Sequence, residues 1–275
     1  MAKHHVQKAK GNAACNIVLI ILSLLWIFPL LFAVIGSMKT KQVYNLTNFW
    51  NMPTTISWGE NFAFITKYSN ILQSICNSLF YALCGSLGSL VLATLAAYGL
   101  TKLKIKHAMF WFMIIYSGTI FPFQMYLIPV FRAYLKTGLY NTRLGLIIFY
   151  IAICIPFSMF VLRNQFLNIP DEVIESATID GASDMRTLLS ILLPMSKSSL
   201  AVVALTQFSW CYNELMFGIT FVNENAIKPI MSTLSTFTSN TPALLTACGI
   251  ASVPTILLYL FLNKNFDSGV VYVSK

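Results

Sequence analysis

Charged residues are scarce in this sequence. Only 10% of its 275 residues are charged and 57% are hydrophobic, whereas about a quarter of the residues in a soluble domain carry charge. This scarcity disfavours a water-soluble fold. The formal net charge is +9, but the basic residues are scattered between apolar stretches and form no continuous patch, which disfavours nucleic acid as a partner. Basic loops on the cytoplasmic side of a membrane explain the excess more simply.

The sequence also lacks the spacing patterns of metal, redox and nucleotide sites. Its three histidines have no metal-ligand spacing, and no two of its six cysteines form a CxxC pair. No GxxxxGK[ST] loop for nucleotide phosphates occurs. We therefore expect no catalytic residues, no metal and no cofactor bound by this chain. The cysteines lie in or beside apolar runs, where they are interpreted as small buried apolar residues.

Long apolar stretches recur along the chain. About 20 apolar residues in a helix cross the hydrocarbon layer, and stretches near this length or longer occur at about 17–36, 74–100, 108–130, 144–162, 199–221 and 242–262. The first follows several lysines, but it is too long for a signal peptide and is interpreted as a retained span. The sequence thus predicts an all-α membrane protein with six transmembrane helices, in which residues 1–16 form a cytoplasmic N-terminus and residues 17–275 a transmembrane domain.

The distribution of basic residues predicts an orientation. Six spans place both termini on one side of the membrane, and a cytoplasmic N-terminus puts most of the 18 Lys and Arg residues inside. The strongest single indication is the cluster of Lys102, Lys104 and Lys106 after the second span. Three basic residues of a short loop expected outside argue against this orientation, namely Arg132, Lys136 and Arg143.

Small residues form a stripe in the second span. Gly85, Ser89, Ala93 and Ala97 recur every four residues, which places them along one face of a helix. Such a stripe lets a second helix approach closely, and close packing is what joins helices in lipid. We expect another span to pack against this face.

Acidic residues gather between the fourth and fifth spans, in residues 164–198. This segment holds five of the nine acidic residues, which are Asp171, Glu172, Glu175, Asp180 and Asp184. Pro170 followed by two acids is typical of a helix start, Gly181 offers a turn and Ser183 can cap a second helix. That second helix carries leucines at helical spacing and ends near Pro194. The segment predicts a helix-turn-helix in the cytoplasm.

Two interpretations of this helix-turn-helix compete. It could lie on the membrane as an amphipathic loop, or it could bind a protein partner. A helix at the membrane interface favours Lys and Arg on its polar face, whereas this segment is acidic. A protein partner is therefore favoured.

Residues Ile169–Ser183 resemble the EAA loop of ABC importer permeases. Glu175-Ser176-Ala177, then Gly181, then Ile191-Leu192-Leu193-Pro194 follow that pattern in order, with serine in place of the usual first alanine. Further similarities are Ser37-Met38-Lys39-Thr40, Leu127-Ile128-Pro129, Gly138 to Thr142, and Asn213-Glu214. Together they resemble the second membrane subunit of maltose-type carbohydrate importers. Residues 269–275 depart from the family's usual C-terminal tail.

The resemblance implies a permease of the bacterial cytoplasmic membrane that translocates a carbohydrate delivered by an extracytoplasmic binding protein. Its partners would be a second permease subunit, membrane lipid and an ABC ATPase dimer, which would use ATP and magnesium. The resemblance also implies that the loop residues that match the motif transmit movement from the ATPase. These residues are Glu175, Ser176, Ala177, Asp180, Gly181, Ala182, Leu193 and Pro194.

Four polar residues are candidates for the translocation path. Glu214 is the one acid inside a predicted span, and buried ions in lipid face protein or water. It could therefore line the path, or it could lie solvated at the outer end of its span. Gln124, Tyr126 and Asn213 are weaker candidates.

Three rival functions remain open at this stage. A secondary transporter that needs no ATP would show internal repeats and ions at mid-membrane, and neither is evident. A membrane enzyme would need clustered His, Asp, Glu or Cys, whereas the acids here suit a coupling helix. A permease for glycerol phosphate or another polar solute would need a basic path, for which Arg132 and Arg143 are the available residues.

Overall fold

The computed structural model describes residues 13–45, 50–103 and 105–262. The expectations for most of the N-terminal segment, for Lys104 and for the divergent tail at 269–275 lie outside these ranges. Helices make up the regular structure of the described residues, and none of them forms a β-strand. The described residues divide into two compact units, one formed by those up to residue 68 together with 237–249 and the other by those within 69–236 and 250–262.

The first unit contains α1 (Ala13–Ser37), α2 (Trp58–Tyr68) and the start of α13 (Thr241–Leu262). Its polar contacts converge on the end of α1. The buried Asn61 amide donates to the backbone carbonyls of Ser37 and Lys39, at 2.8 and 2.9 Å. The Thr246 hydroxyl also donates to the Ser37 carbonyl. These bonds satisfy carbonyls that the end of a helix leaves without a partner inside that helix.

The second unit is built around one long helix. This helix, α3 (Ile71–Lys102), packs against α6 (Arg143–Leu167) and α10 (Lys197–Asn213). Ser89, Ala93 and Ala97 are fully buried in α3. At Gly85 an added Cβ would lie only 2.9 Å from Tyr150 Cβ and 3.1 Å from Cys211 Sγ. The small-residue stripe is therefore confirmed as a close-packing face.

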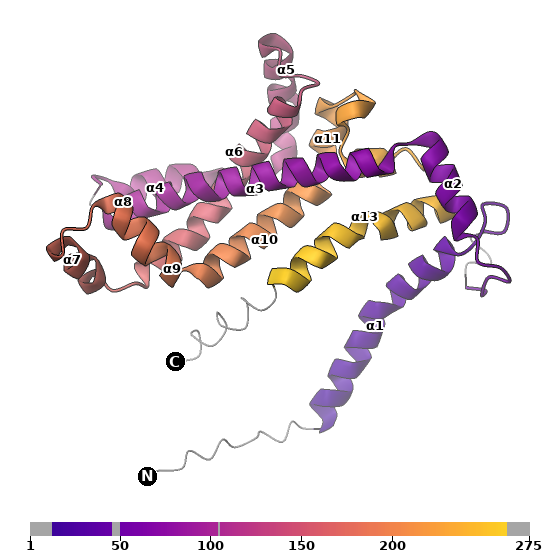
Figure 1. Cartoon of the computed structure of the whole chain (residues 1–275), viewed down its shortest axis with the longest axis horizontal. Helices are drawn as coiled ribbons and strands as arrows, with labels where there is room; N and C mark the ends of the chain where they lie inside the picture. Colours follow the sequence, from indigo (N-terminus) through magenta and orange to yellow (C-terminus); the bar gives the residue numbers. More distant parts are fainter. Residues whose placement is uncertain (1–12, 46–49, 104, 263–275) are drawn as a thin grey trace. The chain divides into compact units, whose positions relative to one another are not determined.

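The remaining helices of this unit are short. They are α4 (Ala108–Ser117), η1 (Phe123–Tyr126), α5 (Leu127–Thr137), α7 (Asp171–Ile179), α8 (Asp184–Thr187), η2 (Leu188–Leu192), α9 (Leu193–Met195), α11 (Met216–Phe221), η3 (Asn225–Ile227) and α12 (Ile230–Leu234). Figure 1 shows α7 and α8 near the C-terminal end of α3.

Among the described residues, four helices are long and apolar enough to cross a membrane, namely α1, α3, α6 and α13. The α10 helix passes the same test only together with the helices before it, across an 82° bend. The third expected span, at about 108–130, is not one continuous helix in the structure. Its residues form α4, an irregular stretch around Gly118–Pro122, η1 and the start of α5. Because Pro122 and Pro129 cannot donate backbone hydrogen bonds, they disfavour one continuous helix there.

Candidate functional site

The acidic segment begins with a short helix. Pro170 precedes α7 with φ −57°, and Asp171 and Glu172 occupy the first turn. Acids at this position face the positive end of the helix dipole, which stabilises the helix. Ala177 is buried, while Glu175, Ser176 and Asp180 are exposed. The helix therefore has one packed face and one uncovered acidic edge.

A tight turn ends this helix. Gly181 has φ +79°, its N–H donates to the Thr178 carbonyl at 3.0 Å, and the N–H of Ala182 donates to Ala177 at 2.9 Å. This is the Schellman arrangement, which favours glycine at the left-handed position. Ser183 then caps α8 by accepting from the Arg186 N–H. The turn thus sets the direction of α7 relative to α8 by local hydrogen bonds.

The sequence predicts one regular α-helix from Ser183 to about Pro194. The structure differs, because this stretch is divided into α8, a π-helical turn and α9. Residues Leu188–Leu192 form a π-helical turn, in which the Leu193 N–H bonds to the Leu188 carbonyl. Pro194 lies in the following helix, α9. Proline has no N–H for the carbonyl four residues before it, and a widened turn directly upstream is consistent with that missing bond.

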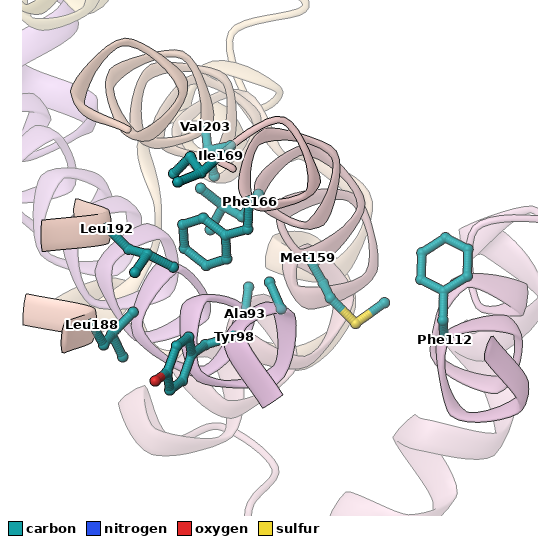
Figure 2. Packing of buried hydrophobic residues seen from close by; sticks show 11 residues of the cluster. Ala93, Tyr98, Phe112, Met159, Phe166, Ile169, Leu188, Leu192 and Val203 are labelled. Atoms are coloured by element: carbon teal, nitrogen blue, oxygen red, sulfur yellow. The ribbon is translucent and has the colours of Figure 1, made fainter. Parts of the chain in front are cut away.

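Two kinds of contact hold the segment against the rest of its unit. Leu188 and Leu192 are buried in a cluster with Phe166 of α6 and Ala93 of α3. Figure 2 shows Leu192, Ile169 and Val203 of this cluster near Phe166, with Phe112 set apart from them. Lys102 at the end of α3 adds polar contacts, because its Nζ donates to the Ile169 carbonyl at 2.8 Å and to Asp171 Oδ1 at 2.6 Å.

Lys102→Met is expected to loosen the start of α7 because it leaves the Ile169 carbonyl without its donor. An unsatisfied buried acceptor costs about 1–3 kcal/mol. Asp171→Asn should have a smaller effect, since Asp171 is 78% exposed while Lys102 is 5% exposed, and exposed ion pairs contribute only about 0–1 kcal/mol. Hydrogen exchange of residues 170–180 measures the difference. Equal exchange in Lys102→Met and the parent chain would show that the contact does not hold the segment.

The outer side of the segment carries an uncovered apolar residue. Ile179 is 85% exposed and lies between the exposed polar residues Thr178 and Asp180. A cavity of about 580 Å³ lies beside it, lined by the end of α3, α7 and Asp184. Ile179 was not among the residues predicted from the sequence. Ile174 and Ala177 mark the packed face of α7. Ile179 follows them by five and two residues, which places it on another side of the helix, and this spacing was the available signal.

The structure places the four path candidates at two breaks between helices. Gln124 is exposed and Tyr126 half-buried in η1, where the Tyr126 hydroxyl donates to the Gly118 carbonyl at 3.3 Å. Asn213 is exposed at the end of α10. Glu214 is 7% exposed, so it is not the solvated residue that one expectation described.

Glu214 is bonded within its own chain. Its carboxylate accepts from the Tyr150 hydroxyl at 3.0 Å and from the backbone N–H groups of Phe217 and Gly218 at 2.9 and 3.1 Å. The carboxylate therefore connects α6 to the first turn of α11 and stabilises the break after α10.

Comparisons with known proteins identify the family. Residues 89–272, which include the acidic segment, match the family model described as binding-protein-dependent transport system inner membrane component. The chain is 26% identical to the diacetylchitobiose uptake system permease protein of Streptomyces coelicolor, over 94% of this chain and 87% of that protein. It is 27% identical to the osmoprotective compounds uptake permease protein of Synechocystis, over 93% and 89% of the two chains.

A solved structure has the same fold. A chain from a bacterial ABC transporter involved in the import of the acidic polysaccharide alginate superimposes with a TM-score of 0.77. The two chains are 21% identical, and the match covers 92% of this chain and 95% of the other. This chain therefore belongs to the family of binding-protein-dependent transport system inner membrane components, the membrane-spanning permease subunits of ABC importers.

Proposed function

We propose that this permease translocates a carbohydrate that an extracytoplasmic binding protein delivers. It would act with a second permease subunit and with two ATPase subunits that bind ATP and magnesium. The diacetylchitobiose permease supports a sugar as the solute. The alternative is glycerol phosphate or another polar solute. The similarity to the osmoprotectant permease supports a polar solute other than a sugar. Uptake of radiolabelled sugars compared with glycerol 3-phosphate distinguishes these solutes.

We infer that the segment at 164–198 is the surface that couples the permease to the ATPase. The observation that carries this proposal is the two-sided character of α7. One side packs through the buried Ala177 and the partly buried Val173 and Ile174, and Lys102 bonds the start of the helix. The other side leaves Glu175, Asp180 and the apolar Ile179 uncovered. An element that is fixed to its own helices and open to a partner can transmit a rigid-body movement.

The proposed coupling residues contribute in two ways. Glu175, Ser176, Asp180, Gly181 and Pro194 are exposed and would contact the partner, whereas Ala177, Ala182 and Leu193 are partly or fully covered and would shape the segment. We add Ile179 to the contacting group. Apolar residues at the centre of a protein interface are desolvated on binding and supply much of its energy.

We propose that all six expected stretches cross the membrane, with both termini in the cytoplasm. Four helices support four of these spans, and the 17-residue α10 (Lys197–Asn213) covers most of the fifth. The third span would then be interrupted around Gly118–Pro122. Non-helical backbone at membrane depth is tolerated where protein or a water-filled cavity covers it, so this interruption favours a place beside the path. Gln124, Tyr126, Asn213 and Glu214 would flank the path at the two breaks, with Glu214 acting through its bonds to α6 and α11.

Cysteine labelling tests the position of the coupling surface. Ile179→Cys is expected to react with a membrane-impermeant maleimide in inside-out vesicles, and the bound ATPase should reduce this reaction. Thr137→Cys is a matched control, because Thr137 is also exposed at a helix end but is expected outside. It should react in right-side-out vesicles instead. The increment over the parent chain is measured, since native Cys15, Cys76 and Cys248 are exposed.

The labelling experiment has clear contrary outcomes. Labelling of Ile179→Cys from the cell exterior would overturn the proposed orientation. Unchanged labelling on removal of the ATPase would place the contact elsewhere on the chain. Solute uptake that persists after deletion of the ATPase would favour the rival function of a secondary transporter.

A further inference from the structure

A cavity lies where the interrupted third span meets α6 and α10. Its volume is about 430 Å³, which falls within the range of about 300–1,000 Å³ for small-molecule sites. It is lined by residues 118–123, by one face of α6 around Phe157, and by Thr206, Gln207 and Trp210 of α10. Trp210 follows Thr206 by four residues and Gln207 by three, so both lie next to it on one side of the helix.

Gln207 is the residue that points to a ligand. It is only 5% exposed and lines the cavity, yet no described residue forms a hydrogen bond with its side-chain amide. The amide is not one of the fully enclosed, unpartnered polar groups of the described residues, so it is reached from the cavity. An occupant that donates or accepts hydrogen bonds would therefore meet an amide with free bonding capacity.

The surroundings of Gln207 define the chemistry of that occupant. Trp210 meets Phe123 edge-on with ring centroids 6.0 Å apart, so two aromatic rings border the cavity. The Thr206 hydroxyl and the Trp210 indole N–H are also without hydrogen-bond partners among the described residues. Apolar ring faces beside hydrogen-bonding groups suit a sugar ring, which presents C–H groups on its faces and hydroxyls around its edge. A lipid tail would leave all three polar groups unsatisfied.

The absence of charge narrows the ligand class. None of the described residues that line the cavity is Asp, Glu, Lys, Arg or His. A phosphate or carboxylate in this cavity would lie beside no basic side chain, which is costly in a site of low polarity. The cavity therefore favours an uncharged sugar over glycerol phosphate or an acidic saccharide.

We propose that this cavity holds one ring of an uncharged sugar during translocation. Gln207 and Thr206 bond the hydroxyls, and Trp210 with Phe123 forms the apolar wall. The inference rests on the proposed carbohydrate transport and specifies the solute site within this chain.

The test uses the complete transporter in proteoliposomes with saturating binding protein. The probes are radiolabelled maltose and diacetylchitobiose, with glycerol 3-phosphate as the charged comparison. Gln207→Met keeps the approximate volume of the side chain but removes its amide. It is expected to lower uptake of the sugar that the parent transports about tenfold or more, the loss that about 1.4 kcal/mol produces. Ser209→Ala, on the same helix but outside the cavity lining, should transport like the parent.

A second measurement separates a ligand contact from a structural role. If Gln207 serves the solute, Gln207→Met removes an amide that makes no hydrogen bond with the described residues, so its Tm should stay close to that of the parent. ATP hydrolysis stimulated by the binding protein should persist in this variant. A Tm lowered by several degrees, or uptake equal to the parent, would overturn the inference while leaving carbohydrate transport intact. A parent chain that moves neither sugar would overturn the carbohydrate assignment and this site with it.

Discussion

Replacing Gly181 by proline is expected to abolish ATP-driven uptake by the complete transporter while the chain still inserts into the membrane. Gly181 has φ +79° and donates its N–H to the Thr178 carbonyl. Proline fixes φ near −65° and has no N–H, so the turn between α7 and α8 cannot form as it does here. Uptake in proteoliposomes, ATP hydrolysis and abundance of the chain in the membrane are measured together.

Alanine variants at two glycines separate backbone strain from coupling. Gly181 and Gly138 have φ +79° and +73°, and an added Cβ would meet no atom within 4 Å at either position. Gly181→Ala and Gly138→Ala therefore introduce a similar strain, about 1–2 kcal/mol for a left-handed residue. Gly181→Ala should reduce uptake several-fold, Gly181→Asn less so because asparagine tolerates this conformation, and Gly138→Ala little. Equal losses at both positions would show that strain alone is responsible.

Reversal of an exposed charge tests the same surface without backbone strain. Glu175 is exposed on α7, and exposed residues usually change stability by less than about 0.5 kcal/mol when replaced. Glu175→Lys should therefore fold normally and still uncouple ATP hydrolysis from uptake. Normal uptake by both Gly181→Pro and Glu175→Lys would contradict the coupling role of the segment.

Replacing Gly85 by leucine is expected to prevent correct packing of α3 against α6 and α10. Even the Cβ of an alanine would lie 2.9 Å from Tyr150 Cβ, an atom next to the backbone of α6 that cannot move without that helix. Overpacking a tight core costs about 1–3 kcal/mol and occasionally more. Leucine adds three further carbons at this contact. The expected result is loss of the monodisperse peak when the detergent extract is analysed by size-exclusion chromatography.

A neighbouring glycine offers a matched comparison. Gly88→Ala brings its Cβ within 2.6 Å of Ile151 Cδ1 and 2.8 Å of Ile151 Cγ1, both side-chain atoms that a change of side-chain rotamer can move without shifting the backbone of α6. Alanine also gains about 1 kcal/mol of helix propensity over glycine. Gly88→Ala should therefore lower the Tm less than Gly85→Ala. Cys76→Leu adds bulk at an exposed position of the same helix and should change the Tm little. A Gly85→Ala variant as stable as Gly88→Ala would refute the close contact.

Local signals in the sequence were sufficient to predict much of the structure of the acidic segment at 164–198. Pro170 before two acids, Gly181 and Ser183 each act through bonds to residues within five positions. The helix start, the turn and the cap could therefore be predicted from adjacent residues. The stripe in α3 was predictable for the same reason, because a helix places every fourth residue on one face.

Contacts between distant segments escaped prediction. Glu214 could be read as path-lining or solvated, and its burial depends on Tyr150, which lies 64 residues earlier. The exposure of Ile179 depends on which face of α7 packs against α3 and α6. The cavity beside Gln207 requires three segments that come together only in the folded unit.

The sequence by itself determined that the chain is a helical membrane permease and where its acidic segment at 164–198 begins and turns. Apolar run length, helix caps and the loop motif are properties of neighbouring residues, and they persist in any arrangement of the helices. Only the tertiary structure decided that α3 packs against α6 and α10, that Lys102 holds the start of α7, and that Glu214 bonds inside the protein. These contacts depend on distances between residues far apart in the chain, which periodicity and local propensity do not encode.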